Sequence, residues 1–305
     1  MPDNNSQCLT FVLKDKSAED FKLLAQFCTQ TPDVNIDSVT VLSPDKAVDI
    51  VITDVSDNLR DRIAKALAAK KLQVDFCLQP VNGLKYERKK SLLICDMDST
   101  LIGQECIDEL ADYAGVKDHV SEITERAMAG ELDFEAALKE RVGLLKGLSL
   151  QALNDCYTDR ITLNPGAKTL AATMKANGAK TVIVSGGFTY FTSRIAGAAG
   201  FEHHHANTLL DDGKTLTGKV GLPILGQDAK KQRLQAYSAD IGGPGAALAI
   251  GDGANDLAMI TTAGLGVAYY AKPIVAEAAD CAVNHTDLTT ALYFQGYKDS
   301  EFVRT

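Results

Sequence analysis

Two aspartates stand two residues apart, directly after a short apolar segment. Asp96 and Asp98 follow residues 91–95, a continuous apolar run that predicts a strand buried on both faces. Two carboxylates at this spacing can reach one reaction centre if the backbone bends where the strand ends. One can act as nucleophile and metal ligand, and the other as general acid and base. Alternatively, this is a solvated loop, or a helix cap that uses Ser99 or Thr100.

A second acidic motif, Gly-Asp-Gly-Ala-Asn-Asp at residues 251–256, follows another apolar run. Mg²⁺ prefers oxygen ligands, so Asp252 could complete a site begun by Asp96, which requires the two side chains to lie within about 8 Å. Asp256, one helical turn on, suits an outer role, and Asn255 could hydrogen-bond the substrate or a lysine. An acidic turn is the alternative, but glycine, acid and amide features coincide here.

Two further motifs could bind phosphate. Ser185 and Gly186 follow an apolar run, where a hydroxyl and backbone N–H groups can contact phosphate oxygens. Lys230 could neutralise charge on a transferred phosphoryl group and on its nucleophile. Without the other motifs, the Ser185-Gly186 motif would be interpreted as an ordinary turn. Lys230, which is next to Lys231, would be interpreted as part of a solvated helix face. All four motifs nevertheless fall at or near predicted strand ends on one edge of a sheet, where parallel sheets bind ligands.

These motifs need an α/β core that brings strand ends together. Helical patterns separate the apolar runs, which predicts a doubly wound parallel sheet with strands at residues 91–95, 181–184, 246–250 and 265–268. Residues 105–160 carry only helical patterns and predict a helical cap inserted after the first strand. The turn signal Asp211-Asp212-Gly213-Lys214 predicts a hairpin insertion at residues 208–223.

The first part of the chain predicts a separate small α+β domain. Its expected order is βαββαβ, typical of a ferredoxin-like module, with strands at residues 9–13, 38–42, 47–52 and 72–78 and helices at 18–28 and 59–69. Residues 79–90, which include Pro80, Gly83 and a basic cluster, read as a linker. We therefore expect domains at residues 1–85 and 86–305.

The composition of the 305-residue chain limits the classes of partner that it is expected to bind. Its net charge of −9, from 31 basic and 40 acidic residues, argues against a broad nucleic-acid or anionic-membrane surface. No run approaches the ~20 apolar residues of a membrane span, and the start of the chain lacks a signal-peptide core. Seven scattered cysteines without a CxxC pair favour a reducing cytoplasm. The run His203-His204-His205 is read as a surface loop rather than a metal site.

The motifs resemble the phosphoserine phosphatase family of the haloacid dehalogenase (HAD) superfamily. The resemblance covers residues 91 to about 287 and rests on Asp96-Met97-Asp98-Ser99-Thr100-Leu101, Glu105, Glu140-Arg141-Val142, Ser185-Gly186-Gly187-Phe188, Gly251-Asp252-Gly253-Ala254-Asn255-Asp256 and Ala271-Lys272-Pro273. It implies Mg²⁺-dependent hydrolysis of O-phosphoserine through a phospho-aspartyl intermediate, the last step of serine biosynthesis. Met97 replaces a phenylalanine often found in the family, and we expect little effect from it. The resemblance also implies an ACT-like N-terminal domain, as a regulatory amino-acid site or a homodimer surface.

The resemblance assigns the catalytic and metal roles to three aspartates. Asp96 would be the nucleophile, and its other oxygen would bind Mg²⁺ together with Asp252. Asp98 would protonate the leaving oxygen of serine and then activate water, and its backbone carbonyl would face the metal.

Substrate binding is assigned in the same way. Glu105 would bind the ammonium group and Arg141 the carboxylate. The phosphate, or the network around it, would be held by Ser185, Gly186, Lys230 and Asn255.

The residues themselves give partial support for this substrate. Arg141 interrupts a helical stripe formed with Phe134, Leu138 and Leu145, and its planar fork matches a carboxylate. A snorkelling arginine or a structural ion pair is the alternative. Together with Glu105, it would select an amino-acid phosphate over other phosphomonoesters.

Four other functions stay open at this point. A dehalogenase is disfavoured because its halide leaves unprotonated and needs no second acid such as Asp98. A broader HAD phosphatase or a phosphomutase would share the same core motifs. Only Glu105 and Arg141, the pair expected to bind an amino acid, distinguish phosphoserine phosphatase from them. A non-catalytic amino-acid sensor is disfavoured by the intact set Asp96, Asp98, Lys230 and Asp252.

Overall fold

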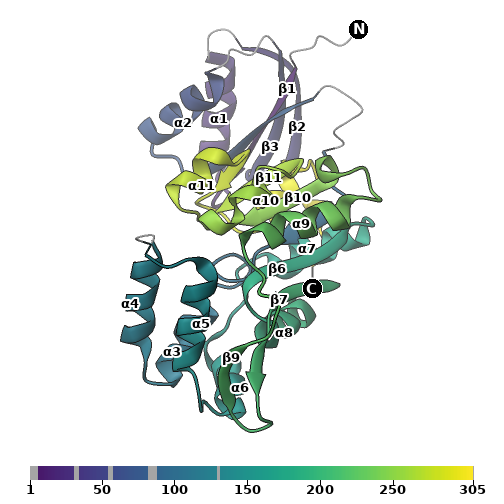
Figure 1. Ribbon diagram of the computed structural model, residues 1–305. Helices are drawn as coiled ribbons and strands as arrows, with labels where there is room; N and C mark the ends of the chain where they lie inside the picture. The colour runs from purple at the N-terminus through teal and green to yellow at the C-terminus, as the bar shows by residue number, and fades with distance from the viewer. Residues whose placement is uncertain (1–5, 31–33, 54–57, 82–87, 129–130, 305) are drawn as a thin grey trace.

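A single ten-stranded sheet organises the protein (Figure 1). The computed structural model describes residues 6–30, 34–53, 58–81, 88–128 and 131–304. The strand order is β2-β3-β1-β4-β12-β11-β10-β5-β6-β7. The strands are β1 (Gln7–Leu13), β2 (Asn35–Ser43), β3 (Ala47–Thr53), β4 (Val74–Pro80), β5 (Leu92–Cys95), β6 (Lys180–Phe188), β7 (His203–Asn207), β10 (Ala247–Gly251), β11 (Leu265–Tyr269) and β12 (Cys281–Val283).

The first four strands and two helices form the expected βαββαβ unit. They are antiparallel in the order β2-β3-β1-β4, the arrangement of a ferredoxin-like module. The helices are α1 (Ala18–Gln30) and α2 (Leu59–Ala69). Apolar side chains of the strands and of both helices, including Phe11, Leu24 and Ile63, pack together in a hydrophobic core that is separate from the core of the rest of the chain.

The remaining strands form the predicted doubly wound core. β5 lies inside it, with β6 and β7 on one side and β10, β11 and β12 on the other, all parallel. The winding therefore reverses between β5 and β10, which is where such sheets bind ligands. Because alternate residues of a strand face opposite ways, Leu93 packs with α7 (Ala167–Ala176) and α8 (Thr189–Ala199). Leu92 packs with α9 (Gln227–Ser238) and α10 (Leu257–Ile260).

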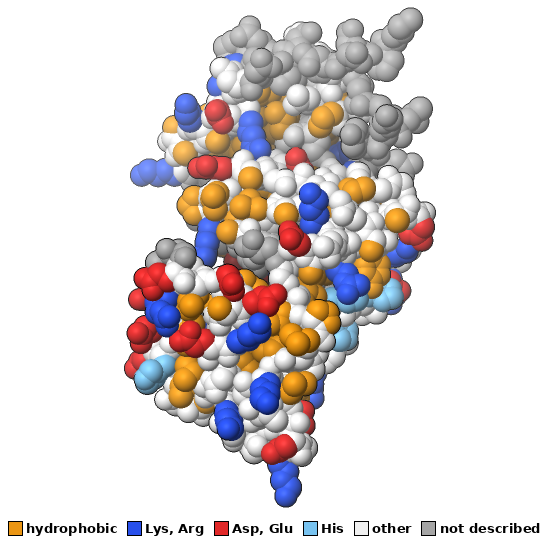
Figure 2. Space-filling model, viewed as in Figure 1, with side chains coloured by type: hydrophobic (Ala, Val, Ile, Leu, Met, Phe, Trp, Pro, Cys, Tyr) orange, Lys and Arg blue, Asp and Glu red, His pale blue; other side chains and the backbone are white. Residues whose placement is uncertain are grey.

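The predicted cap is helical throughout its described part. It consists of α3 (Cys106–Tyr113), α4 (Lys117–Met128), α5 (Phe134–Leu144) and α6 (Leu150–Arg160). Asp133 begins α5 by accepting a hydrogen bond from the Ala136 amide, and Ser149 caps α6 in the same way. Acidic and basic side chains crowd the outer face of the cap, as expected for solvated helices (Figure 2).

The predicted hairpin insertion is present as β8 (Leu209–Asp211) and β9 (Leu216–Val220). Gly213 adopts a positive φ of 87° in its turn, as the turn signal requires. The hairpin packs against α5 of the cap, and Ser149 and Thr215 form an isolated bridge between the two insertions.

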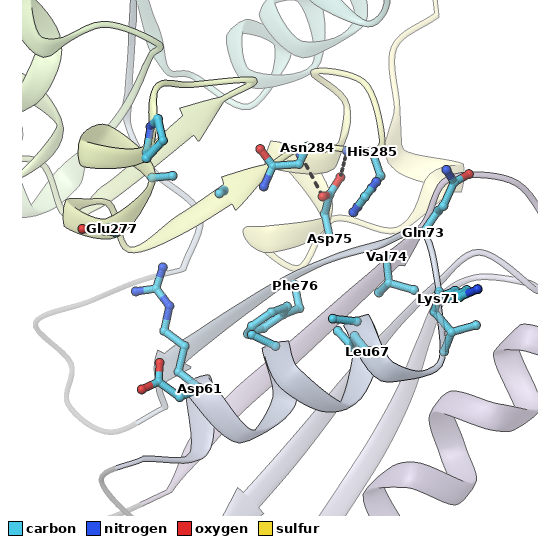
Figure 3. A pocket seen from close by; sticks show the side chains of 17 residues that line it. Asp61, Leu67, Lys71, Gln73, Val74, Asp75, Phe76, Glu277, Asn284 and His285 are labelled. Carbon is cyan, nitrogen blue, oxygen red and sulfur yellow. Dashed lines mark hydrogen bonds between the residues drawn. The ribbon is translucent and has the colours of Figure 1, made fainter.

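The two parts of the chain share one sheet rather than two. β12 is parallel to β11 and also pairs antiparallel with β4, with Ala282 opposite Phe76. Beside this pair, the Asp75 carboxylate accepts hydrogen bonds from the backbone of Asn284 and His285 (Figure 3). The sequence did not predict β12, because three residues are too short for a periodic pattern. The boundary at residue 85 stays a prediction.

One local expectation was wrong. His203, His204 and His205 form the edge strand β7 instead of a loop, and His205 contacts the hydroxyl of Tyr237 at 2.9 Å. The linker expected at residues 79–90 stays a prediction, because residues 82–87 lie outside the described part. At its two ends, β4 continues to Pro80, and Arg88 forms a 2.6 Å ion pair with Asp49.

The C-terminal elements α11 (Pro273–Ala278) and α12 (Thr290–Phe294) cover the sheet near β11, β1 and β4. Among the described helices, none has the length and apolar character to cross a membrane.

Candidate active site

Three aspartates from two acidic motifs meet where the winding of the sheet reverses. Asp96 follows β5 and Asp252 follows β10, and these strands are neighbours in parallel register. With Asp256, they place carboxylate oxygens within 4.8 Å of one another. This separation is inside the limit of about 8 Å set above for sharing one cation.

Lys230 of α9 lies buried beneath the aspartates. Its ammonium is 2.7 Å from Oδ2 of Asp96 and 2.6 Å from Oδ1 of Asp256. Burial opposes its charge, but the two carboxylates more than offset this and raise the pKa of Lys230, so the amine stays protonated. Burial and the charge of Asp256 raise the pKa of Asp96, while Lys230 acts in the opposite direction.

Asp98 is held in place by two different elements. Its Oδ1 accepts a 2.9 Å hydrogen bond from the Cys106 amide at the start of α3, and its Oδ2 accepts one of 3.2 Å from the Ser185 hydroxyl on β6. Burial raises the pKa of Asp98, although these hydrogen bonds lower it. A carboxyl with a raised pKa can carry a proton to a leaving group.

The donor set fits a Mg²⁺ ion. Thr100 donates a 3.1 Å hydrogen bond to Oδ1 of Asp252, which orients this carboxylate toward Asp96. Asp256 is engaged elsewhere: its Oδ1 pairs with Lys230, and its Oδ2 accepts from the amides of Asp252 and Gly253. Asp96 and Asp252 also line the cavity described next, whereas Asp256 does not, so the first two are the carboxylates that can meet a cation there, and Asp256 orders the loop around them.

A cavity of about 340 Å³ opens between these motifs and the cap. Predicted site residues in its wall are Asp96, Asp98, Glu105, Arg141, Ser185, Gly186, Asp252 and Asn255. Lys230 contacts Asp96 from below instead of facing the cavity. A larger hollow of about 790 Å³ beside α2 and α11 contains none of the predicted site residues (Figure 3).

The cap contributes the two groups predicted to recognise an amino acid. Arg141 of α5 donates to the Ala137 carbonyl at 3.3 Å and reaches the Thr124 hydroxyl at 3.5 Å. Burial lowers the pKa of Arg141. Glu105 lies in the cavity wall and is exposed to solvent. The protein atoms around its carboxylate partly desolvate it, and this effect and the charge of Asp98 raise the pKa of Glu105 to about 7.

Glycine is required at one point near the end of β6. Ser185 and Gly186, expected in a turn after the strand, lie within β6, whose pairing with β7 is irregular between Val184 and Phe188. A Cβ added to Gly187 would lie 2.6 Å from Oδ2 of Asp98 and 3.1 Å from the Ser185 hydroxyl. The Gly187 amide donates a 2.9 Å hydrogen bond to that hydroxyl. This part of β6 can therefore approach Asp98 only without a side chain at Gly187.

Comparison with known families agrees with this geometry. Residues 93–261 match the family model of haloacid dehalogenase-like hydrolases. The chain belongs to this family. The match covers β5, the cap, β6 and the motif after β10, so it contains every site residue predicted above.

Relatives of this haloacid dehalogenase-like hydrolase are phosphoserine phosphatases. The chain is 40% identical over 249 residues to the phosphoserine phosphatase of Archaeoglobus fulgidus, covering 81% of this chain and 71% of that one. A solved structure of a probable phosphoserine phosphatase from Vibrio cholerae is similar over 95% of this chain and 86% of that one, with 32% identity and a TM-score of 0.77. A phospho-aspartyl intermediate analogue of phosphoserine phosphatase is 40% identical, covering 68% of this chain and 99% of that one, with a TM-score of 0.61.

Sequence reasoning missed several groups around the cavity of this hydrolase. Thr100 is in the first motif but was considered only as a helix cap. Lys272 was quoted for the resemblance without a role, and it lies in the cavity wall. Asp108 and Thr124 also line the cavity, but no pattern in the sequence singled them out because they lie on the amphipathic helices α3 and α4.

Proposed function

We propose that this protein hydrolyses O-phosphoserine to serine and inorganic phosphate, as the last step of serine biosynthesis. The proposal depends mainly on one observation: Asp96, Asp98 and Asp252 line one cavity together with Arg141 and Glu105. The first three residues suit phosphoryl transfer, and the other two suit the charged groups of an amino acid.

In the first half-reaction, a carboxylate oxygen of Asp96 attacks phosphorus. The bond between phosphorus and the serine oxygen breaks, and Asp98 gives its proton to that oxygen. Met97 and Lys230 donate to the two oxygens of Asp96 at 2.7 Å each, which fixes the orientation of the nucleophile. The product of this step is serine and a phospho-aspartyl group on Asp96.

In the second half-reaction, water attacks the same phosphorus and Asp98 takes its proton. Phosphate leaves, and the Asp96 carboxylate is restored. Ser185, Gly186 and Asn255 contact the phosphate oxygens from the cavity wall. Asp96, Asp252 and the backbone carbonyl of Asp98 would hold Mg²⁺, which supplies positive charge against the phosphate oxygens.

Selectivity for an amino-acid phosphate comes from the cap. Among the described residues, no carboxylate forms an ion pair with Arg141, so its half-buried guanidinium is available to a substrate carboxylate. Glu105 stands in the same cavity and pairs with the substrate ammonium. Binding of both charges would also draw the cap over the site and exclude bulk water.

Phosphate release from O-phosphoserine tests the proposal when it is compared with para-nitrophenyl phosphate and glucose phosphates, each with Mg²⁺. We expect kcat/KM to be highest for O-phosphoserine by at least about tenfold, since a charge-assisted hydrogen bond contributes roughly 1.5–3 kcal/mol. Equal rates would favour a broader phosphatase. Phosphate transfer between sugar positions would favour a phosphomutase, and binding without turnover would favour a sensor.

Arg141→Ala examines the substrate assignment. We expect KM for O-phosphoserine to rise by about tenfold to a hundredfold, with a much smaller change for para-nitrophenyl phosphate. Arg126→Ala is the matched control, because Arg126 pairs with Glu140 on the outside of the cap. Equal effects of Arg141→Ala on both substrates would contradict a role in carboxylate binding.

A cytoplasmic location, a homodimer and an ACT-like role for the N-terminal module remain predictions of the sequence. Gel filtration of the full chain tests the second, and amino-acid binding by the full chain tests the third.

A further inference from the structure

Ser99 has a backbone conformation that is unusual for its residue type. Its φ is 53°, in the left-handed region that glycine adopts most easily. Ser99 follows Asp98 directly, and its amide donates to the Gln104 carbonyl at 3.2 Å. Holding a serine in this region costs free energy, so the surrounding structure must compensate.

The hydroxyl of Ser99 provides one such interaction. It donates a 2.7 Å hydrogen bond to Oε1 of Glu105. One residue further along, the Cys106 amide donates to Asp98 at 2.9 Å. Two successive residues after β5 are thus tied to two successive residues at the start of α3.

Without such a tether, the Glu105 side chain could turn away from the cavity. It is exposed and has several rotatable bonds, so many of its conformations point into the solvent. The hydrogen bond from the Ser99 hydroxyl restricts the carboxylate to conformations near the loop that carries Asp98.

We propose that Ser99 is a positioning residue that sets the distance between the ammonium-binding carboxylate of Glu105 and the proton donor Asp98. The inference rests on the proposed function and adds a specificity role to a residue of the catalytic loop. Because Asp98 and Ser99 are consecutive, the carboxylate that binds the substrate ammonium is fixed relative to the acid that protonates its leaving oxygen. Ser99 itself touches neither the phosphate nor the reacting atoms in this scheme.

The test compares three substrates that differ in their charged groups. O-phosphoserine and O-phosphoethanolamine carry an ammonium, and para-nitrophenyl phosphate does not. For Ser99→Ala, we expect KM to rise about tenfold for the two ammonium substrates and less than about twofold for the third, as for loss of one hydrogen bond to a charged group. A purely structural role would raise KM for all three alike.

Two further variants separate the hydroxyl from the backbone. Ser99→Gly also removes the donor but relieves the left-handed conformation, so it should match Ser99→Ala in KM while being more stable. Ser99→Asn tolerates this conformation and offers N–H donors, so it should recover part of the ammonium selectivity. Ser149→Ala, which removes a capping hydroxyl outside the cavity, is the control.

The outcomes distinguish this inference from the proposed function. A selective wild-type enzyme whose KM values are unchanged in Ser99→Ala, or raised equally for all substrates, would overturn the positioning role alone. A wild-type enzyme without any preference for ammonium substrates would overturn both.

Discussion

The roles proposed for the four aspartates of the site differ because their hydrogen-bond and ion-pair partners differ. Asp256 is saturated by Lys230 and two backbone amides, so it serves as a structural anchor. Asp98 accepts from an amide and a hydroxyl and stays close to the cavity. Asp96 lies next to the ammonium that stabilises its charge. Under the proposed function, the four aspartates therefore have four roles: Asp256 is the anchor, Asp98 the acid, Asp96 the nucleophile and Asp252 a metal ligand.

Replacing the proposed acid should affect the two half-reactions differently. In Asp98→Asn, we expect kcat for O-phosphoserine to fall by about 10²–10⁴-fold, because the serine oxygen cannot leave easily without a proton. Para-nitrophenolate leaves without one, so the first step should continue while hydrolysis of the intermediate slows. Rapid-mixing experiments should then show a burst of about one nitrophenolate per active site.

Asp96→Asn should show neither a burst nor turnover, and Asp118→Asn, on the outer surface of the cap, should behave like wild type. A burst in Asp96→Asn would rule out Asp96 as the nucleophile.

The raised pKa of Asp252 predicts how the metal-free protein responds to pH. Burial and the charge of Asp256 raise this pKa from 3.8 to about 6. Between these values the folded protein holds a proton that the unfolded chain has released, so the free energy of unfolding should decrease as pH rises from about 4 to 6. Mg²⁺ binds the ionised form and should raise Tm more at neutral pH than at the acidic end of this window.

Thermal unfolding with and without Mg²⁺ over this range measures both effects. Asp252→Asn should lose most of the Mg²⁺ shift and part of the pH slope. Wild-type protein that became more stable as pH rose through this window, with no response to Mg²⁺, would contradict the assignment.

At the scale of an element, the irregular end of β6 requires a residue without a side chain at Gly187. In Gly187→Ala, the new Cβ would meet Asp98 at 2.6 Å, so either the acid or the β6 backbone must move. We expect kcat for O-phosphoserine to fall by at least about tenfold, because small misplacements of reacting groups are costly. Steady-state kinetics and a crystal structure of the variant would measure the loss and the displacement.

Gly197→Ala is the control for this change. Gly197 lies in α8, and no atom is within 4 Å of a Cβ placed there. The variant should keep wild-type kinetics and gain up to about 1 kcal/mol of stability, as expected for alanine in a helix. Similar kinetics in both variants would mean that the end of β6 can accommodate a methyl group.

The elements that carry most of the site could be predicted because the two acidic motifs and the Ser185 motif lie at the ends of strongly apolar strands, whereas Lys230 lies on α9. Asp96 and Asp252 are far apart in sequence, but both come directly after buried runs, and parallel strands bring their carboxyl ends to one edge. The helix around Arg141 was predicted from its apolar stripe. The hairpin followed from a single turn signal at Gly213.

Other features could not be read from the sequence, for physical reasons. His203, His204 and His205 form an edge strand although they lack the apolar pattern of one, because β6 supplies the backbone partners. β12 is only three residues long and is defined by the strands on both sides of it. The contact between Thr124 and Arg141 joins two helices, so it depends on their packing and not on a local pattern.

At the scale of the whole molecule, Asp75 connects the N-terminal module to the core. Its buried carboxylate accepts hydrogen bonds from the amides of Asn284, His285 and Thr286 and from the Thr286 hydroxyl, at 2.6 to 3.2 Å. Asp75→Ala would remove the acceptor of all three amides, while the Thr286 hydroxyl would keep its contact with the Thr290 hydroxyl. We expect a loss of about 3 kcal/mol in the free energy of unfolding, measured by urea denaturation.

Asp37→Ala is the matched control, since Asp37 is exposed on the outer strand β2. It should change stability by less than about 0.5 kcal/mol. A comparably small effect of Asp75→Ala would show that the module and the core are joined mainly by other contacts.

The short pairing of β4 with β12 has a consequence for shortened versions of this protein. Without residues 1–80, β12 would become an exposed edge strand with unpaired N–H and C=O groups. Ala282 would lose its partner Phe76. Exposed edge strands pair with strands of other molecules, which leads to domain swapping or aggregation. The N-terminal module therefore protects the catalytic part from aggregation by covering β12.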